Sequence, residues 1–143
     1  MTTHPDDERL TALLRARGQR VTSQRLVIHR VLREQATHLT AEAMREAVAE
    51  DLPGTSLPTI YATLDLLVEL GLAQRMGTGV GAALYDARTE PHHHTVCREC
   101  GAVEDLDGAL DISALLRAAR GAGFHAASTD VLLTGRCSRC AAR

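Results

Sequence analysis

The stretch "SLPTIYATLDLLVELGL", from Ser56 to Leu72, has the features of an amphipathic helix. Ser56 is a candidate N-cap, and Pro58 lies in the first turn, where a missing backbone N–H costs little. Apolar side chains recur at helical spacing up to Gly71, which is a suitable end. The residues expected on the buried face are Ile60, Leu64, Leu67 and Val68. The segment is therefore predicted to be a helix with one buried and one polar face.

Three shorter helices are predicted before this one, and a hairpin after it. Helical periodicity is present in "DDERLTALLRARG", "TSQRLVIHRVLREQ" and "TAEAMREAVAEDLPG". Their expected inward residues are Leu10, Leu13, Leu14, Val27, Val31, Leu32, Ala43, Met44, Ala47 and Val48. The glycines within "AQRMGTGVGAALYD" favour a β-hairpin. This order of elements predicts a winged helix-turn-helix domain over residues 1–84.

Two features of this half favour DNA binding. The outer face of the fourth helix is expected to carry hydrogen-bonding side chains near its N-terminus, as a recognition helix does. Those residues are Ser56, Thr59, Tyr61 and Thr63. From Arg9 to Arg33 there are seven arginines and no acid, which would attract the phosphate backbone. The alternative is a protein-binding helical domain whose arginines form an ordinary solvated face.

Residues 85–143 change character and predict a small second domain. Short apolar runs, a helix in "LDISALLRAARGAG" and a run in "STDVLLTGRCSRC" give the order strand, strand, helix, strand. The apolar stripe of that helix consists of Ile112, Leu115, Leu116 and Ala119. Fewer than 60 residues build a thin core, so this α/β unit is expected to need a metal, a partner subunit or both. The whole chain is thus predicted to have a mixed α/β (α+β) fold.

The four cysteines form two C-x-x-C pairs, Cys97 with Cys100 and Cys137 with Cys140. Each pair can supply two thiolates to one tetrahedral Zn²⁺, and a closed Cys₄ site is structural. The alternatives are a thioredoxin-type redox pair or unrelated thiols. A redox motif needs only one pair, so the presence of two favours zinc.

The histidines of "PHHHTVCREC" require a separate explanation. In an extended strand His92 and His94 share one face, while His93 points the other way and is expected to be a bystander. Asp86, Asp105 and His38 are the groups that could join them. Imidazole and carboxylate without thiolate suit Fe²⁺, Mn²⁺, Zn²⁺ or Ni²⁺ more than Cu⁺. The alternative is a solvated polar run at a strand entrance.

Other classes of protein fit the sequence less well. No apolar run reaches membrane-spanning length and the polar start lacks a signal-peptide apolar region, so no membrane association and a cytoplasmic location are expected. A zinc deaminase would need H-x-E and P-C-x-x-C, and neither occurs. A structural zinc adaptor would explain the cysteines but not the arginine-rich segment. The chain is therefore not expected to be an enzyme.

The order of the motifs carries a resemblance to a known family. "RVTSQR", "HLTAE", "SLPTIYATLDLLVELGL", "HHHTVCRECG" and "GRCSRC" follow one another as in the ferric uptake regulator (Fur) family of bacterial metalloregulators. The resemblance covers roughly Leu10 to Cys140. It implies a winged-helix repressor with a C-terminal dimerisation domain, working as a homodimer on double-stranded operator DNA. Two-fold symmetry of the dimer implies a pseudo-palindromic operator.

The resemblance also implies roles for individual residues. The two cysteine pairs correspond to the family's structural zinc site. Tyr61 corresponds to a base-contacting tyrosine of the recognition helix, and Arg20 to a basic residue that approaches the minor groove. The regulatory Fe²⁺ or Mn²⁺ site, for which Zn²⁺ or Ni²⁺ are alternatives, corresponds to His38, Asp86, His92, His94 and Asp105.

Aspartate at both acidic positions resembles the peroxide-sensing branch and the actinobacterial regulators of catalase genes. In that branch Fe²⁺ reacts with H₂O₂ and a coordinating histidine is oxidised, for which His38 and His92 are the candidates here. The alternative is an iron, zinc or nickel uptake regulator of the same family. Ala62 departs from a common arginine, and Thr129 from a histidine of an additional metal site, so no third metal site is expected.

Overall fold

A computed structural model describes residues 4–35, 38–79 and 81–143 of the chain. The chain divides into two compact units, Met1–Thr89 and Glu90–Arg143. The boundary expected after residue 84 falls inside a strand of the first unit, because Leu84–Asp86 pairs with Gln74–Met76. Hairpin pairing therefore moves the division five residues towards the C-terminus. Neither unit contains, in its described part, a helix long and apolar enough to cross a bilayer.

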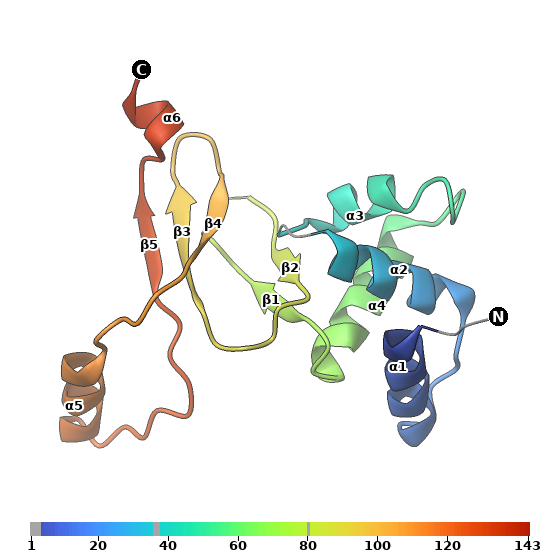
Figure 1. Ribbon diagram of the computed structural model, residues 1–143, viewed down its shortest axis with the longest axis horizontal. Helices are drawn as coiled ribbons and strands as arrows, with labels where there is room; N and C mark the ends of the chain where they lie inside the picture. The colour runs from blue at the N-terminus through green and yellow to red at the C-terminus, as the bar shows by residue number, and fades with distance from the viewer. Residues whose placement is uncertain (1–3, 36–37, 80) are drawn as a thin grey trace. The chain divides into compact units, whose positions relative to one another are not determined.

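The N-terminal unit consists of four helices followed by a two-stranded hairpin (Figure 1). This order confirms the winged helix-turn-helix expected from the sequence. The wing is antiparallel, with Arg75 opposite Tyr85. The elements are α1 (Pro5–Ala16), α2 (Ser23–Glu34), α3 (Ala41–Ala47), α4 (Leu57–Glu69), β1 (Gln74–Met76) and β2 (Leu84–Asp86).

Side-chain caps fix where the helices begin. The hydroxyls of Thr22, Thr40 and Ser56 each accept a hydrogen bond from a backbone N–H in the first turn of α2, α3 and α4 respectively. Pro58 lies in the first turn of α4, as expected, where it removes no intrahelical bond. Gly71, just beyond α4, has a φ of 70°, a conformation that ends a helix and is disfavoured for other residues.

The core of this unit is one cluster of buried apolar side chains. One sequence expectation about it is wrong, because Ala47 is exposed on α3. Val27 packs against the cluster as expected, and its neighbour Ile28, which was not predicted, is fully buried on α2. The cluster consists of Leu10, Leu14, Ile28, Leu32, Ala41, Met44, Val48, Ile60, Leu64, Leu67, Leu70, Leu72, Ala73 and Tyr85.

The C-terminal unit is a three-stranded sheet with strand order β4-β3-β5. β3 (His93–Cys97) is antiparallel to β4 (Val103–Leu106) and parallel to β5 (Leu132–Gly135). The helix α5 (Ser113–Gly121) lies in the connection between β4 and β5, which confirms the predicted order. A short helix, α6 (Ser138–Ala141), was not predicted and follows the last strand.

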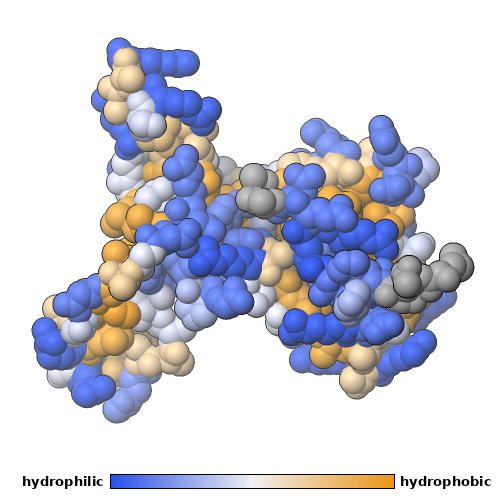
Figure 2. Space-filling view, in the orientation of Figure 1, coloured by the Kyte–Doolittle hydropathy of each residue, from blue (hydrophilic) through white to orange (hydrophobic). Residues whose placement is uncertain are grey.

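Few side chains are buried in this second unit. Among its described residues the buried apolar side chains are Val96, Cys97 and Cys140. No residue of α5 is buried, and Leu115 and Leu133 are more than half exposed. Apolar surface is visible around α5 in Figure 2. The thin core expected from the sequence is confirmed.

Candidate metal centres and nucleic-acid interface

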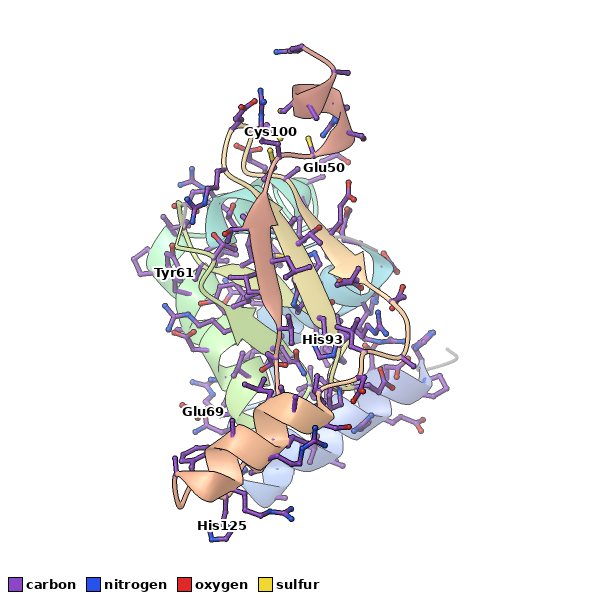
Figure 3. All side chains as sticks on the ribbon, turned by 90° about the vertical axis from the view of Figure 1, so that its left-hand side faces the viewer. Glu50, Tyr61, Glu69, His93, Cys100 and His125 are labelled. Carbon is purple, nitrogen blue, oxygen red and sulfur yellow. The ribbon has the colours of Figure 1, made fainter. Side chains whose placement is uncertain are left out.

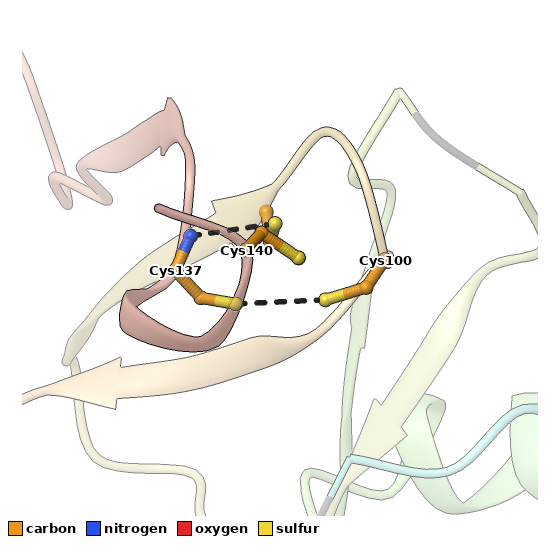
Figure 4. Close-up of side chains that lie close together, drawn as sticks. Cys100, Cys137 and Cys140 are labelled. Carbon is orange, nitrogen blue, oxygen red and sulfur yellow. Dashed lines mark hydrogen bonds between the residues drawn. The ribbon is translucent and has the colours of Figure 1, made fainter. Parts of the chain in front are cut away.

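The four cysteine sulfurs converge between the β3–β4 turn and the start of α6 (Figure 4). Each residue of this thiol cluster offers an Sγ within 4.8 Å of the others, and none forms a disulfide. The Sγ atoms of Cys100 and Cys137 are 3.7 Å apart. Four thiolates about 2.3 Å from a tetrahedral Zn²⁺ lie about 3.8 Å from one another. The donor set and its spacing therefore fit zinc.

The local backbone stabilises thiolates in this cluster. The Cys137 N–H donates to the Cys97 sulfur at 3.4 Å, and this bond and further backbone N–H groups lower the pKa of Cys97 to about 6. The Cys140 N–H lowers the pKa of Cys137 in the same way. Donation of the Cys140 thiol to Cys137 raises the pKa of Cys140, so this thiol keeps a proton that a metal would have to displace. Backbone N–H groups thus favour the thiolate form of two of the four sulfurs.

A first imidazole–carboxylate pair lies in the N-terminal unit. His38 Nε2 is 3.3 Å from Asp86 Oδ2, and both side chains are largely buried. The other carboxylate oxygen of Asp86 accepts a hydrogen bond from the Arg88 N–H at 2.9 Å, which fixes its orientation. An isolated bridge between Leu39 and Tyr85 holds the two segments together. The structure thus brings together two of the five predicted regulatory residues within this unit.

The other three predicted regulatory residues meet in the C-terminal unit. Asp105 Oδ1 lies 3.3 Å from His92 Nε2 and 3.5 Å from His94 Nε2. His94 and Asp105 are direct cross-strand neighbours on β3 and β4. The two imidazole rings are 4.4 Å apart, which confirms that they share one face. The Nε2 atoms and the carboxylate are thus gathered at one place.

The immediate surroundings prepare these imidazoles for ligation. His92 Nδ1 is 2.8 Å from the Glu90 carbonyl oxygen, which can only accept, so Nδ1 carries the proton and Nε2 presents a lone pair. Nitrogen–oxygen distances of 3.3 and 3.5 Å are close to those between ligands about 2.1 Å from a common ion. His93 instead accepts a hydrogen bond from the Val131 N–H at 3.0 Å and so helps to attach β5 to β3. Its expected role as a bystander to the metal agrees with this contact.

The predicted DNA-contacting residues are placed differently from one another. Tyr61 projects from α4 and is partly exposed (Figure 3). Ser56 and Thr59 lie in its first turn, where the Ser56 hydroxyl accepts from the Thr59 N–H at 3.4 Å. Thr63 is only 5% exposed, so its expected position on the outer face is wrong. It lies three residues after Ile60, which places it on the buried face of the helix.

Several side chains of the arginine-rich segment form contacts within the protein that the sequence did not predict. Arg30 forms an ion pair with Asp7 at 2.9 Å, and Arg33 forms one with Asp6. Arg25 donates to the Arg20 carbonyl oxygen at 2.6 Å, and Arg20 itself is exposed. The two aspartates lie two and three residues before Arg9, outside the acid-free segment, so a count of charges inside that segment missed them. A search for acidic side chains on α1 that could pair with arginines on α2 would have identified these two ion pairs.

A buried tyrosine and a buried histidine were also missed. Tyr85 on β2 is fully buried, and its hydroxyl donates to Asp65 Oδ1 on α4 at 2.8 Å. Burial and this hydrogen bond raise the pKa of Tyr85 to about 12, so the hydroxyl remains a donor at neutral pH. His29 on α2 is 2% exposed, and its Nδ1 has no hydrogen-bond partner among the described residues. The spacing of residues within the sequence motifs does not indicate that either side chain is buried.

Comparison with known proteins identifies the family. Residues 16–133 match the model of the ferric uptake regulator family. The chain is 35% identical to the ferric uptake regulation protein of Bacillus subtilis (strain 168), covering 93% of each. It is also 35% identical to the peroxide-responsive repressor PerR of Staphylococcus aureus (strain USA300), covering 69% of this chain and 67% of the relative.

A solved structure supports the same assignment for the fold. The ferric uptake regulator Fur of Helicobacter pylori, whose structure is described as revealing three functional metal-binding sites, aligns with a TM-score of 0.83 at 22% identity. The alignment covers 94% of this chain and 90% of the Helicobacter pylori chain. Because the family model spans residues 16–133 and the Bacillus subtilis relative matches over 93% of both chains, the chain belongs to the ferric uptake regulator family.

Proposed function

We propose that this family member is a metal-dependent, DNA-binding repressor that senses H₂O₂ and controls oxidative-stress genes such as that of catalase. The supporting observation is the pair of short carboxylates beside imidazoles, Asp86 beside His38 and Asp105 beside His92 and His94. Aspartate at both acidic positions is the pattern that the sequence shares with the peroxide-sensing branch. The 35% identity to a peroxide-responsive repressor is consistent with this reading.

The proposed metals follow from the two kinds of donor set. The thiol cluster would hold a structural Zn²⁺, which four cysteines leave with no open position. The three imidazoles and two carboxylates would bind one regulatory ion, Fe²⁺ or Mn²⁺, with Zn²⁺ or Ni²⁺ as further candidates. Since His38 and Asp86 belong to the N-terminal unit and the other three to the C-terminal unit, binding of one ion would link the two units.

Oxidation of a ligand would convert peroxide into a change in DNA binding. Bound Fe²⁺ would act as the redox catalyst that activates H₂O₂, and the imidazole would supply the two electrons that reduce it overall. In the net reaction one oxygen atom of H₂O₂ is inserted into an imidazole C–H bond of His38 or His92, which gives a hydroxyl or its oxo tautomer, and the other oxygen leaves as water. A modified imidazole is a poorer ligand, so the metal-bound conformation loses population and the DNA is released. The protein is consumed as a sensor, and no turnover is involved.

The DNA-binding form is proposed to be a homodimer. Exposed leucines lie on α5 and on both faces of β5, and a second copy of the C-terminal unit would cover apolar surface of this kind; they are Leu115, Leu116, Leu132 and Leu133. Two copies would present two α4 helices to a pseudo-palindromic operator. Tyr61, Ser56 and Thr59 would approach the bases, while Arg20 would approach the backbone or minor groove.

A second candidate is an iron, zinc or nickel uptake regulator. The similarity to the Bacillus subtilis ferric uptake regulation protein favours it, because it extends over 93% of the chain at the same identity. Both candidates share the dimer, the zinc and the DNA-binding helix. They differ in whether peroxide modifies the Fe²⁺-loaded protein.

The decisive experiment compares Fe²⁺-loaded and Mn²⁺-loaded protein, prepared without oxygen, before and after brief exposure to H₂O₂. A DNA duplex enriched from a random pool by the Mn²⁺-loaded protein serves as the probe, and intact mass reports modification. Loss of binding only in the iron form, with one oxygen added at His38 or His92, is expected. If mass and DNA binding are unchanged by H₂O₂, and DNA affinity depends only on which metal is supplied, the peroxide-sensing proposal is wrong and the uptake regulator is the remaining candidate.

A further inference from the structure

The strand that carries Asp86 is attached to the loop that carries His38 by two backbone hydrogen bonds. The Leu39 N–H donates to the Tyr85 carbonyl at 3.0 Å, and the Tyr85 N–H donates to the Leu39 carbonyl at 2.8 Å. Each of these residues directly neighbours a proposed ligand in sequence. Any movement that draws His38 and Asp86 together is therefore passed to the backbone of Tyr85.

The side chain of Tyr85 connects that backbone to the helix α4. Its ring is fully buried in the core cluster of the N-terminal unit. Its hydroxyl emerges beside α4 and donates to Asp65 Oδ1 at 2.8 Å. A tyrosine side chain has only two χ angles, and this one is held by backbone hydrogen bonds at one end and by Asp65 at the other, so a displacement at one end would reach the other.

The hydrogen bond ends on the face of α4 that is proposed to contact DNA. Asp65 lies four residues after Tyr61, so the two side chains are neighbours on the helix surface. Both side chains reach the surface to some extent, whereas Ile60, Leu64 and Leu67 form the buried stripe on the other side. The Tyr85 hydroxyl is thus bonded one helical turn from the residue proposed to read bases.

We propose that Tyr85 is a positioning residue, which couples occupation of the His38–Asp86 pair to the placement of the Tyr61 face of α4 through its hydrogen bond to Asp65. This inference rests on the proposed function, since it takes the pair as metal ligands and α4 as the DNA-contacting helix. Metal and DNA would then favour the same arrangement of this connection, so each raises the affinity for the other. The bond adds nothing to the ligand set and touches neither metal nor DNA.

The test variant is Tyr85→Phe in the full chain, because it keeps the ring and removes only the hydroxyl. DNA affinity is measured with and without Mn²⁺ on the enriched duplex, and Mn²⁺ affinity is measured without DNA. The ratio of the two DNA affinities reports coupling. We expect that ratio to fall about fivefold or more, a typical size for coupling between sites. Mn²⁺ affinity in the absence of DNA is expected to change much less.

Variants at Asp65 separate the hydrogen bond from the charge. Asp65→Asn removes the charge but keeps a carbonyl oxygen that can accept, so the ratio is expected to be close to that of the unmodified protein. Asp65→Ala removes the acceptor and is expected to lower the ratio as Tyr85→Phe does, with no additional effect in the double variant. Glu69→Gln, one turn further along α4 and also exposed, is the matched control and should leave the ratio unchanged.

A purely structural role would give a different pattern. In that case Tyr85→Phe would weaken DNA binding equally with and without Mn²⁺, and the unchanged ratio would overturn the proposal. If Tyr85→Phe does not fold, the comparison of Asp65→Ala with Asp65→Asn decides the question alone. A protein whose DNA binding shows no dependence on Mn²⁺ before any substitution would instead contradict the proposed function, and the coupling with it.

Discussion

The two units of this chain solve the problem of stability in different ways. The described part of the N-terminal unit buries fourteen apolar side chains in one cluster, whereas the C-terminal unit buries Val96, Cys97 and Cys140. Two of those three are cysteines of the thiol cluster. The first unit can therefore be held by the hydrophobic effect, while we expect the second to depend on the proposed sulfur–metal bonds and the proposed second copy. The helix α5 illustrates the second case, because it has an apolar stripe but no buried residue.

The largest effect is expected from removing a zinc ligand. Cys137→Ser should unfold the C-terminal unit, because structural zinc sites contribute about 10 kcal/mol or more to the folding of small domains. The N-terminal unit should keep its fold. Amide hydrogen exchange should rise in β3, β4 and β5 while α4 stays protected. Ser138→Ala, next to the same ligand, is the control; equal loss of protection in both units would contradict the comparison.

The next largest effect is expected in the N-terminal core. Leu64→Ala should lower the free energy of unfolding by about 2–5 kcal/mol, since it leaves a cavity in a fully buried position. Both tyrosines of the chain, Tyr61 and Tyr85, lie in this unit, so tyrosine fluorescence during urea unfolding reports on it alone. Leu133→Ala makes the same chemical change at a side chain that is 52% exposed and should leave this transition unmoved.

A smaller effect, on dimer formation, is expected at the exposed leucines of the C-terminal unit. Leu133→Asp should weaken self-association by about tenfold or more, because a carboxylate would be desolvated at the proposed dimer contact. Sedimentation equilibrium measures the dimer constant directly. Arg117→Ala, at an exposed position of α5 that is not three or four residues from Leu115 or Leu116, is the control. A dimer constant that does not respond to Leu133→Asp would place the contact elsewhere.

The smallest effect is expected at His29, a polar group within the apolar unit. Burial and the neighbouring Arg33 guanidinium lower the pKa of His29 below 6.5, against the opposing effect of Asp6 and Asp7. Because the folded pKa is depressed, the unfolded chain takes up this proton first as pH falls. The free energy of unfolding is therefore highest above pH 6.5, where His29 is neutral in both states. It decreases as pH falls below 6.5 and towards the folded pKa of His29, because the unfolded chain is then protonated more readily.

His29→Leu should therefore stabilise the N-terminal unit, by about 1 kcal/mol at about pH 8 and by more at about pH 5. Urea unfolding followed by tyrosine fluorescence at the two pH values gives both numbers. His125→Leu alters an exposed histidine of the other unit and should not change the tyrosine transition. An equal gain at both pH values would show that His29 titrates alike in the folded and unfolded states.

Sequence patterns predicted the elements well because the signals are local. A capping serine, an early proline and a terminal glycine determine α4, and each acts within one turn of the helix. The i, i+2 spacing of His92 and His94 likewise places both rings on one face of β3. The convergence of the cysteines was predicted from their spacing too, because two C-x-x-C pairs in one chain are typical of a single zinc site.

The errors arose where a long-range contact decides the outcome. Thr63 was assigned to the outer face because it is polar, but its distance from Ile60 along the helix places it inside. The domain boundary was misplaced because pairing of β1 with β2 is not local. The partner of Tyr85 is twenty residues away in the sequence, so no pattern of neighbouring residues could indicate it.

The ion pairs between α1 and α2 bear on the response of DNA binding to ionic strength. Binding releases counterions from DNA, and the logarithm of affinity falls with the logarithm of salt in proportion to the phosphates neutralised, with a slope of about −0.9 for each. Arg30 and Arg33 already have carboxylate partners, which leaves five of the seven arginines between residues 9 and 33. For DNA binding as proposed, this segment of each subunit contributes a slope no steeper than about −4.5. High salt would then weaken DNA binding less than the number of arginines suggests, and short-range contacts of α4 would account for more of the affinity that persists.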